Sequence, residues 1–339
     1  MEPRQITPII CLLWSVGLVL PAAGQTQAPF REGRLPPMEV MLQDQEPFDT
    51  GAPQYLLASD PAEFVLPEDV LASTEPHLSA YKQSFFQKLS FTVTGIVPDG
   101  SDGLGILETE LFAAFALPAP TTKTPLILTP TFSVDFIDEP AYVALPSELY
   151  GLWLDLMWLP KFGPRATGIL AIAPGWYSDF QDGWDDSFRL TGRALLRYDW
   201  IPDRLQLVLG TVYTNRMANR WIPAAGLIIN PNPDLSLDLI FPRAKMARRT
   251  AWGLGFEHWI YIAGGFGGND WTIVQPDDSR DKLGLLDWRI SLGWERKMNG
   301  GAGFHVEVGY VFSREIRLAS EPETFRPDDT LLLRAGIAF

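Results

Sequence analysis

The feature that most constrains this chain is a strict two-residue alternation between residues 188 and 200. One face of this stretch is apolar or small throughout, and the other holds three arginines, Arg189, Arg193 and Arg197. Successive side chains of a β-strand point to opposite sides, so the stretch is predicted to be a strand with one apolar and one charged face. A fold built from such strands must place the two faces in different surroundings.

The same period recurs along most of the chain after residue 85. Residues 286–295 and 330–339 repeat it clearly, and less regular versions occupy 85–97, 104–116, 126–137, 149–159, 166–177, 205–214, 221–229, 235–241, 249–263 and 303–316. Turn-forming residues separate these segments, and helical periodicity is absent, which predicts an all-β fold. The segments number thirteen. Because single-chain bacterial barrels normally have an even number of strands, a fourteenth is expected at 271–274, with twelve as the alternative.

Two architectures can use such strands: a soluble sandwich, or a transmembrane β-barrel with its apolar face toward lipid. The segments are about 10 to 13 residues long, which suits a strand that crosses a bilayer at a tilt. Aromatic residues also bracket the apolar faces, as in the aromatic girdles of membrane barrels. The expected girdle residues are Phe188, Tyr198, Trp200, Trp288 and Trp294. These features favour a single antiparallel transmembrane barrel of about 12–14 strands over residues 85–339.

The chain ends on an alternating strand whose last residue, Phe339, belongs to the apolar face. This ending resembles the C-terminal signature of bacterial outer-membrane barrels, in which a terminal aromatic is read by the barrel assembly machinery. The segment 221–245, the glycine run 264–268 and the ending 329–339 also resemble an uncharacterised family of exported bacterial outer-membrane β-barrel proteins, a domain of unknown function. The resemblance implies a fold and a location. It supplies no activity and no catalytic residues.

The N-terminal part of the chain reads differently from the rest. Arg4, an apolar run at 9–20 and the small residues that follow predict a signal peptide over 1–24, with cleavage as late as residue 28. Residues 25–84 contain eight prolines and ten acidic residues against three basic ones. Prolines at this density break helices and strands, so this segment is predicted to be an extended, largely unstructured acidic linker. The protein is therefore expected in the outer membrane of a Gram-negative-type bacterium.

The polar faces of the strands are the expected lining of the lumen. They mix both signs of charge, which fits ion pairs in a polar interior. The candidates are Arg189, Arg193, Arg197, Asp199, Glu108, Glu110, Asp287, Arg289, Glu295, His305, Glu307 and Arg334. Two interpretations stay open: the arginines attract solutes in a pore, or they pair with acids on neighbouring strands.

Enzyme chemistry is not expected, because no nucleophile elbow, zinc-binding helix or phosphate loop occurs. His305 and Glu307 share the inward face, so a barrel enzyme that uses them is a second alternative. No cofactor and no metal site are expected. The weak exception is a calcium site in the acidic loop with Asp179, Asp182, Asp185 and Asp186.

The sequence therefore predicts an integral outer-membrane barrel, most simply a passive, porin-like pore for small solutes. The main alternative is a structural or adhesive surface barrel with a plugged lumen and no transport. Expected partners are the lipid bilayer, the barrel assembly machinery and small solutes. The net charge of −14 excludes generic binding to nucleic acid, which needs a basic face.

Overall fold

The computed structural model describes residues 78, 82, 84–98, 100, 103–121, 124–181 and 186–339. Strands dominate these residues and belong to one sheet. The elements are β1 (Phe86–Ile96), β2 (Gly105–Thr121), β3 (Thr124–Asp138), β4 (Glu148–Trp158), β5 (Ala166–Ser178), β6 (Phe188–Ile201), β7 (Leu205–Tyr213), β8 (Trp221–Asn232), β9 (Leu235–Phe241), β10 (Arg243–Gly253), β11 (Phe256–Gly267), β12 (Asp270–Val274), β13 (Arg280–Met298), the short 3-10 helix η4 (Asn299–Gly301), β14 (Gly303–Leu318), β15 (Thr324–Phe325) and β16 (Thr330–Ala338).

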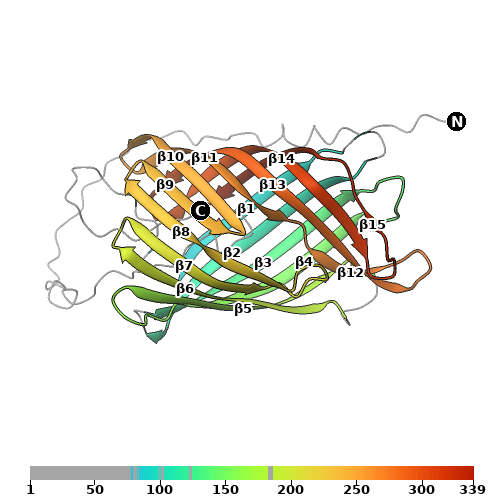
Figure 1. The fold of residues 1–339 in the computed structure, drawn as a ribbon, viewed down its shortest axis with the longest axis horizontal. Helices are drawn as coiled ribbons and strands as arrows, with labels where there is room; N and C mark the ends of the chain where they lie inside the picture. The colour runs from blue at the N-terminus through green and yellow to red at the C-terminus, as the bar shows by residue number, and fades with distance from the viewer. Residues whose placement is uncertain are drawn as a thin grey trace, which may run out of the picture. The chain divides into compact units, whose positions relative to one another are not determined.

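Fourteen of these strands close into an antiparallel barrel. The strands β1 to β11 pair in chain order, and the circuit continues from β11 through β13, β14 and β16 back to β1. The last rung joins Leu89 and Phe339, whose backbone N–H groups donate to each other's carbonyl at 3.0 and 2.9 Å. The strands run obliquely to the long axis of the barrel (Figure 1). The predicted all-β barrel of fourteen strands is confirmed, and its last strand, β16, pairs with its first, β1.

The two faces of each strand lie in different surroundings, as the alternation predicts. On β6 the side chains of Phe188, Leu190 and Leu196 are exposed on the outside of the barrel, whereas Arg189 and Arg197 are buried inside it. The same pattern holds on β16, where Leu331, Leu333 and Ile337 are exposed. An apolar exterior that is left uncovered over so many strands is typical of a barrel that stands in lipid.

The fourteenth strand is not where the sequence pattern placed it. Residues 249–263 were expected to form one strand, but the chain reverses there at a two-residue turn, Leu254-Gly255, between β10 and β11. The expected extra strand at 271–274 exists as β12, but it adds no position to the wall. It pairs with the start of β13, in line with β11, after a break at Gly268. Gly268 has φ +73, and a Cβ there would lie 2.1 Å from the Leu285 carbonyl oxygen. The break therefore requires glycine.

β12 crosses from one part of the wall to another. Thr272 forms a parallel bridge with Ser178 of β5, although six wall strands, β6 to β11, separate β5 from β13. The result at this end is a smaller ring of nine strands: β12, β13, β14, β16 and β1 to β5. Apolar side chains fill that ring and include Leu149, Trp271, Ile273, Leu283 and Ile316, all of them almost wholly buried. We call this cluster the ring core.

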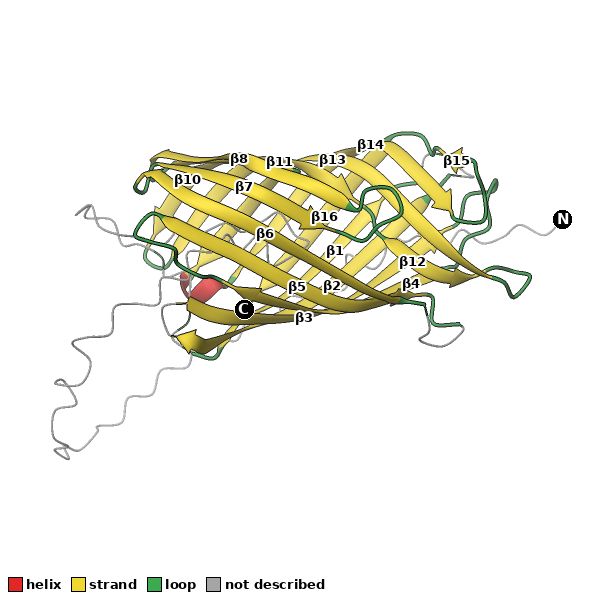
Figure 2. Ribbon diagram, turned by 60° about the horizontal axis from the view of Figure 1, so that its bottom comes forward, coloured by secondary structure: helices red, strands yellow, loops and turns green. Residues whose placement is uncertain are grey.

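The connections differ between the two ends of the barrel. One end, which we call the terminal end, carries the Leu89–Phe339 rung and the turns at 159–165, 202–204, 233–234, 254–255 and 299–302. The other, the hairpin end, carries β12, β15 and the longer connections 139–147, 179–187, 214–220 and 319–329. β12 and β15 lie at the same end in both views (Figures 1 and 2). Apart from the one-residue connection at Pro242 and the seven-residue turn 159–165, shorter turns lie at the terminal end and longer loops at the hairpin end, as is typical of an outer-membrane barrel.

The predicted signal peptide and almost all of the predicted acidic linker lie outside the described residues, and both stay predictions. Within the described part of the chain, no helix is long and apolar enough to span a membrane.

Candidate functional site in the barrel lumen

A cavity of about 390 Å³ lies inside the barrel. It touches the ring core at Tyr177, and it touches a second buried apolar cluster at Leu195, Ala224 and Ile240. That second cluster is built by inward positions of β3 to β9 and by Leu159. Six arginines and four acidic residues line the cavity: Arg189, Arg193, Arg216, Arg243, Arg289, Arg334, Glu108, Glu110, Asp135 and Asp155. The cavity is thus lined by charged side chains and borders both apolar clusters.

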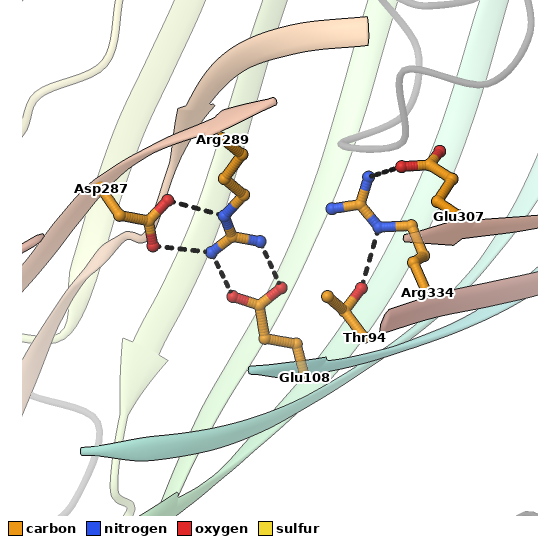
Figure 3. Close-up of polar contacts among 6 residues, drawn as sticks. All are labelled: Thr94, Glu108, Asp287, Arg289, Glu307 and Arg334. Atoms are coloured by element: carbon orange, nitrogen blue, oxygen red, sulfur yellow. Dashed lines mark hydrogen bonds and ion pairs between the residues drawn. The ribbon is translucent and has the colours of Figure 1, made fainter. Parts of the chain in front are cut away.

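Arg289 of β13 is held between two carboxylates (Figure 3). Its Nη1 and Nη2 donate to Glu108 of β2 at 2.8 and 2.6 Å, and its Nε and Nη2 donate to Asp287 at 2.6 and 2.9 Å. Paired N–H donors that meet both carboxylate oxygens make the strongest geometry for this kind of ion pair. A Cβ on the neighbouring Gly267 would lie 2.0 Å from Arg289 Nε, so this part of the glycine run leaves room for the guanidinium.

Arg334 of β16 makes a second bridge across the wall. Its Nη1 donates to Glu307 of β14 at 3.3 Å, and its Nε donates to the Thr94 hydroxyl of β1 at 3.0 Å (Figure 3). Glu307 also accepts from the Tyr261 hydroxyl at 2.7 Å. This network links β11, β14, β16 and β1 at the seam where the barrel closes.

The three arginines of β6 have different partners. Arg193 donates through Nη1 and Nη2 to Asp155 of β4 at 2.9 and 3.1 Å. Arg197 lies 4.0 Å from Asp199, a loose ion pair. Arg189 donates to the Asp270 backbone carbonyl and to the amide oxygen of Asn269, and its guanidinium stacks on Tyr177 at 3.8 Å. The three arginines therefore do not form one continuous row of equivalent charges along the lumen.

A third charged group lies nearer the terminal end. Glu295 of β13 accepts from Lys245 at 2.9 Å and lies 3.3 Å from Lys297. Both lysines also stack on aromatic rings, Lys245 on Tyr261 at 4.0 Å and Lys297 on Trp259 at 4.9 Å. Paired charges that bury their stems against aromatic rings stiffen the interior of a barrel.

The structure brings together part of the conceivable acid–base cluster at His305, since His305 lies opposite Glu295 across the hairpin. Register places His305 opposite Glu295 and Gly336. Glu307, its expected partner, accepts from Tyr261 and Arg334. Each oxygen of the Glu307 carboxylate thus already accepts from a donor on the barrel wall, Oε1 from Tyr261 and Oε2 from Arg334. The geometry therefore gives the enzyme alternative little support.

The residues of the weak calcium candidate that the structure describes secure β12. Asp179 accepts from the backbone N–H of Val274 at 2.8 Å. The Asp186 carbonyl accepts from Thr272 at 3.0 Å, and its carboxylate lies 3.4 Å from Arg280. Asp182 and Asp185 lie outside the described residues, and no group of three metal-binding side chains occurs among the residues described.

Sequence reasoning missed several lumen residues. Arg243, Lys245 and Arg249 alternate along β10 and would have been found if the strand had been started at 243 instead of 249. Arg216 carried no such signal, because it lies in the loop 214–220, where strand alternation does not apply. The expected girdle residues Phe188, Tyr198 and Trp200 are exposed outside, and Trp288 and Trp294 pack against the aromatic rings of Phe266 and Phe304.

Comparison with known proteins adds a fold likeness and nothing more specific. No family model matches the chain, so the resemblance of 221–245 to an uncharacterised barrel family stays an expectation. No curated protein matches either. Among solved structures, LpxR from Salmonella typhimurium is similar, with 10% identity and a TM-score of 0.35 over 74% of this chain and 99% of LpxR. A likeness at that level carries no information on activity.

Proposed function

We propose that this protein is an integral outer-membrane β-barrel of a Gram-negative-type bacterium. The exposed apolar exterior supports this, because an apolar surface of this extent is unfavourable in water, whereas lipid chains would cover it. The short turns at the terminal end fit the periplasmic side, and the longer connections at the hairpin end fit the cell exterior. The bilayer and the barrel assembly machinery are then its partners.

We propose further that the barrel binds small solutes in its lumen and conducts them across the outer membrane through a narrow path. The single observation that carries this is the cavity of about 390 Å³ with ten charged residues in its lining. A general-diffusion porin of comparable strand number would need a continuous, water-filled lumen. Here the ring core fills part of the lumen at the hairpin end, and the apolar cluster of β3–β9 borders the cavity on one side. We therefore propose a solute-specific barrel of low conductance in place of a general porin-like pore.

The ring core also supports a second candidate, a structural surface barrel without transport. Trp271, Ile273 and Leu283 are each at most 3% exposed, so the ring of nine strands has the packing of a solid plug. In this candidate the cavity would be an internal space with no role in transport.

Conductance in a planar bilayer tests the two candidates against each other. The purified barrel, reconstituted in chloride and then in phosphate salts, should give small discrete steps that differ between the two anions. A silent bilayer at all voltages would favour the structural barrel. Large steps that simply scale with salt concentration would contradict both and restore the open porin.

A further inference from the structure

A site at the hairpin end of the cavity has the composition of a phosphate-binding site. Three arginines line the cavity there: Arg189 on β6, Arg216 in the loop 214–220 and Arg243 at the start of β10. Arg189 and Arg243 both act electrostatically on Arg216, so the three charges lie within range of one another. Like charges repel, and a fold brings them together only at a cost that an anion can offset.

Arg189 is fixed and incompletely satisfied. Its side chain is 8% exposed, and the groups that accept from its Nη atoms, a backbone carbonyl and the Asn269 amide oxygen, carry no formal charge. Its Nε is buried with no hydrogen-bond partner. Stacking on Tyr177 holds the guanidinium plane at the cavity. A buried donor without an acceptor is costly, so an acceptor in the cavity would stabilise it.

Backbone hydrogen bonds of its loop hold Arg216 in place. The backbone N–H of Met217 donates to Asp270 at 2.6 Å, and Thr214 N–H donates to the Arg220 carbonyl at 2.9 Å, which closes the loop. Burial and the charge of Arg189 lower the pKa of Arg216 to about 10, although Asp270 acts in the opposite direction. Asp270 is thus the carboxylate that acts on Arg216, and the cavity lining as a whole holds two more arginines than acidic residues.

We propose that Arg189, Arg216 and Arg243 form a binding site for a phosphate monoester or inorganic phosphate. Guanidinium groups pair two N–H donors with two phosphate oxygens, and several of them together favour a dianion over chloride. The cavity volume is in the range of small-molecule sites, so it can hold a phosphate with a small organic group attached. This site specifies a ligand class for the proposed function. It rests on the proposed function only in that it requires the folded barrel with its lumen.

Calorimetric titration of the full-length mature barrel, refolded in a neutral detergent, tests the site directly. Inorganic phosphate is the first probe, and a short-chain phosphatidic acid in the same detergent is the second. Saturable binding of inorganic phosphate, with chloride at equal ionic strength failing to compete, supports a soluble phosphate ligand. Binding of the phosphatidic acid alone supports the same site with a lipid headgroup as its source.

Two variants assign the binding to these residues. Arg216→Gln should weaken phosphate binding at least tenfold, since it removes a charge that makes no hydrogen bond among the described residues. Arg220→Gln is the matched control, because Arg220 carries the same charge in the same loop and is exposed. It should leave the affinity within twofold. Heat-modifiable migration on gels confirms that both variants are folded.

Failure of the site and failure of the proposed function are distinguishable. If neither probe binds, or if Arg216→Gln binds as tightly as the parent, the site is wrong whatever the conductance shows. If phosphate binds as expected in a barrel that shows no conductance, the site stands and the transport proposal fails.

Discussion

Thr272 and Ser178 pair across the mouth of the barrel, and this single bridge turns a ring of fourteen strands into a smaller ring of nine at the hairpin end. Asp179 and Asp186 reinforce it through Val274 and Thr272. Because the smaller ring is filled with apolar side chains, the cavity of about 390 Å³ reaches this end beside β12, where Arg189 lines it and donates to the Asp270 carbonyl. Any solute route is therefore expected to run beside β12 and not through the ring.

A disulfide between positions 178 and 272 tests that route. The doubly substituted barrel, Ser178→Cys with Thr272→Cys, should cross-link readily, because bridged strands bring Cα atoms within disulfide range. Cys11 is the sole cysteine of the sequence and falls in the predicted signal peptide. Conductance should be the same before and after reduction, while the oxidised form should melt at a higher temperature. A cross-link that silences the channel would mean that β12 must move for solutes to pass.

The facing of β6 can be tested with single arginines. Leu190 is 45% exposed on the outside, and Thr191 lines the cavity. Arginine on the lipid face near mid-membrane costs roughly 2–4 kcal/mol. Leu190→Arg and Ala194→Arg should therefore reduce folding yield in vesicles far more than Thr191→Arg. Measuring the folding yield of each variant both in vesicles and in water distinguishes a face that contacts lipid from a face that is buried in a soluble core. Equal yields for all three variants would refute the facing.

Arg289 should be the most sensitive charge in the lumen. Replacing it by Met leaves the Glu108 and Asp287 carboxylates without their donors, and breaking such a pair on one side costs about 3–5 kcal/mol. Adding Glu108→Gln and Asp287→Asn should recover most of the loss. Urea unfolding from vesicles measures both, with Arg220→Met at the exposed loop as the control. The account of this network fails if Arg289→Met is no more damaging than the control.

Substitutions at Phe339 can distinguish an effect on barrel assembly in cells from an effect on the free energy of unfolding. Its ring is 58% exposed, and its backbone completes the rung with Leu89. Phe339→Ala keeps the rung, so the free energy of unfolding should fall by about 1–2 kcal/mol, less than for a fully buried ring. Outer-membrane levels in cells should fall severalfold if the ring is the assembly signal. Deleting the residue removes the rung as well and should lower both quantities. Normal levels of Phe339→Ala in the membrane would contradict the targeting role.

The wall of the barrel could be predicted from sequence because the alternation of polar and apolar residues within each strand indicates which side chains face inward and which face outward. The arginines at 189, 193 and 197 could face only inward, and the even strand count followed from closure. The turn at Leu254-Gly255 was missed because apolar residues flank it, Trp252 and Phe256, so the alternation runs on without an obvious break.

The lumen could be predicted only in part. The alternation gave Glu108, Arg289, Glu307 and Arg334 an inward position but no partners, since register across distant strands decides which charges meet. The path of β12 depends on its pairing with β5, more than ninety positions away in the sequence. Arg216 lies in a loop, so only its tertiary neighbours place it in the cavity.

Single-channel recording in a planar bilayer shows whether the barrel passes small anions through its arginine-lined cavity. The conductance steps should be small and discrete, and their reversal potential in a salt gradient should show a preference for anions. Phosphate should reduce them in the parent protein but not in Arg216→Gln. Steps as large as those of an open pore of fourteen strands, with no response to phosphate, would contradict this expectation.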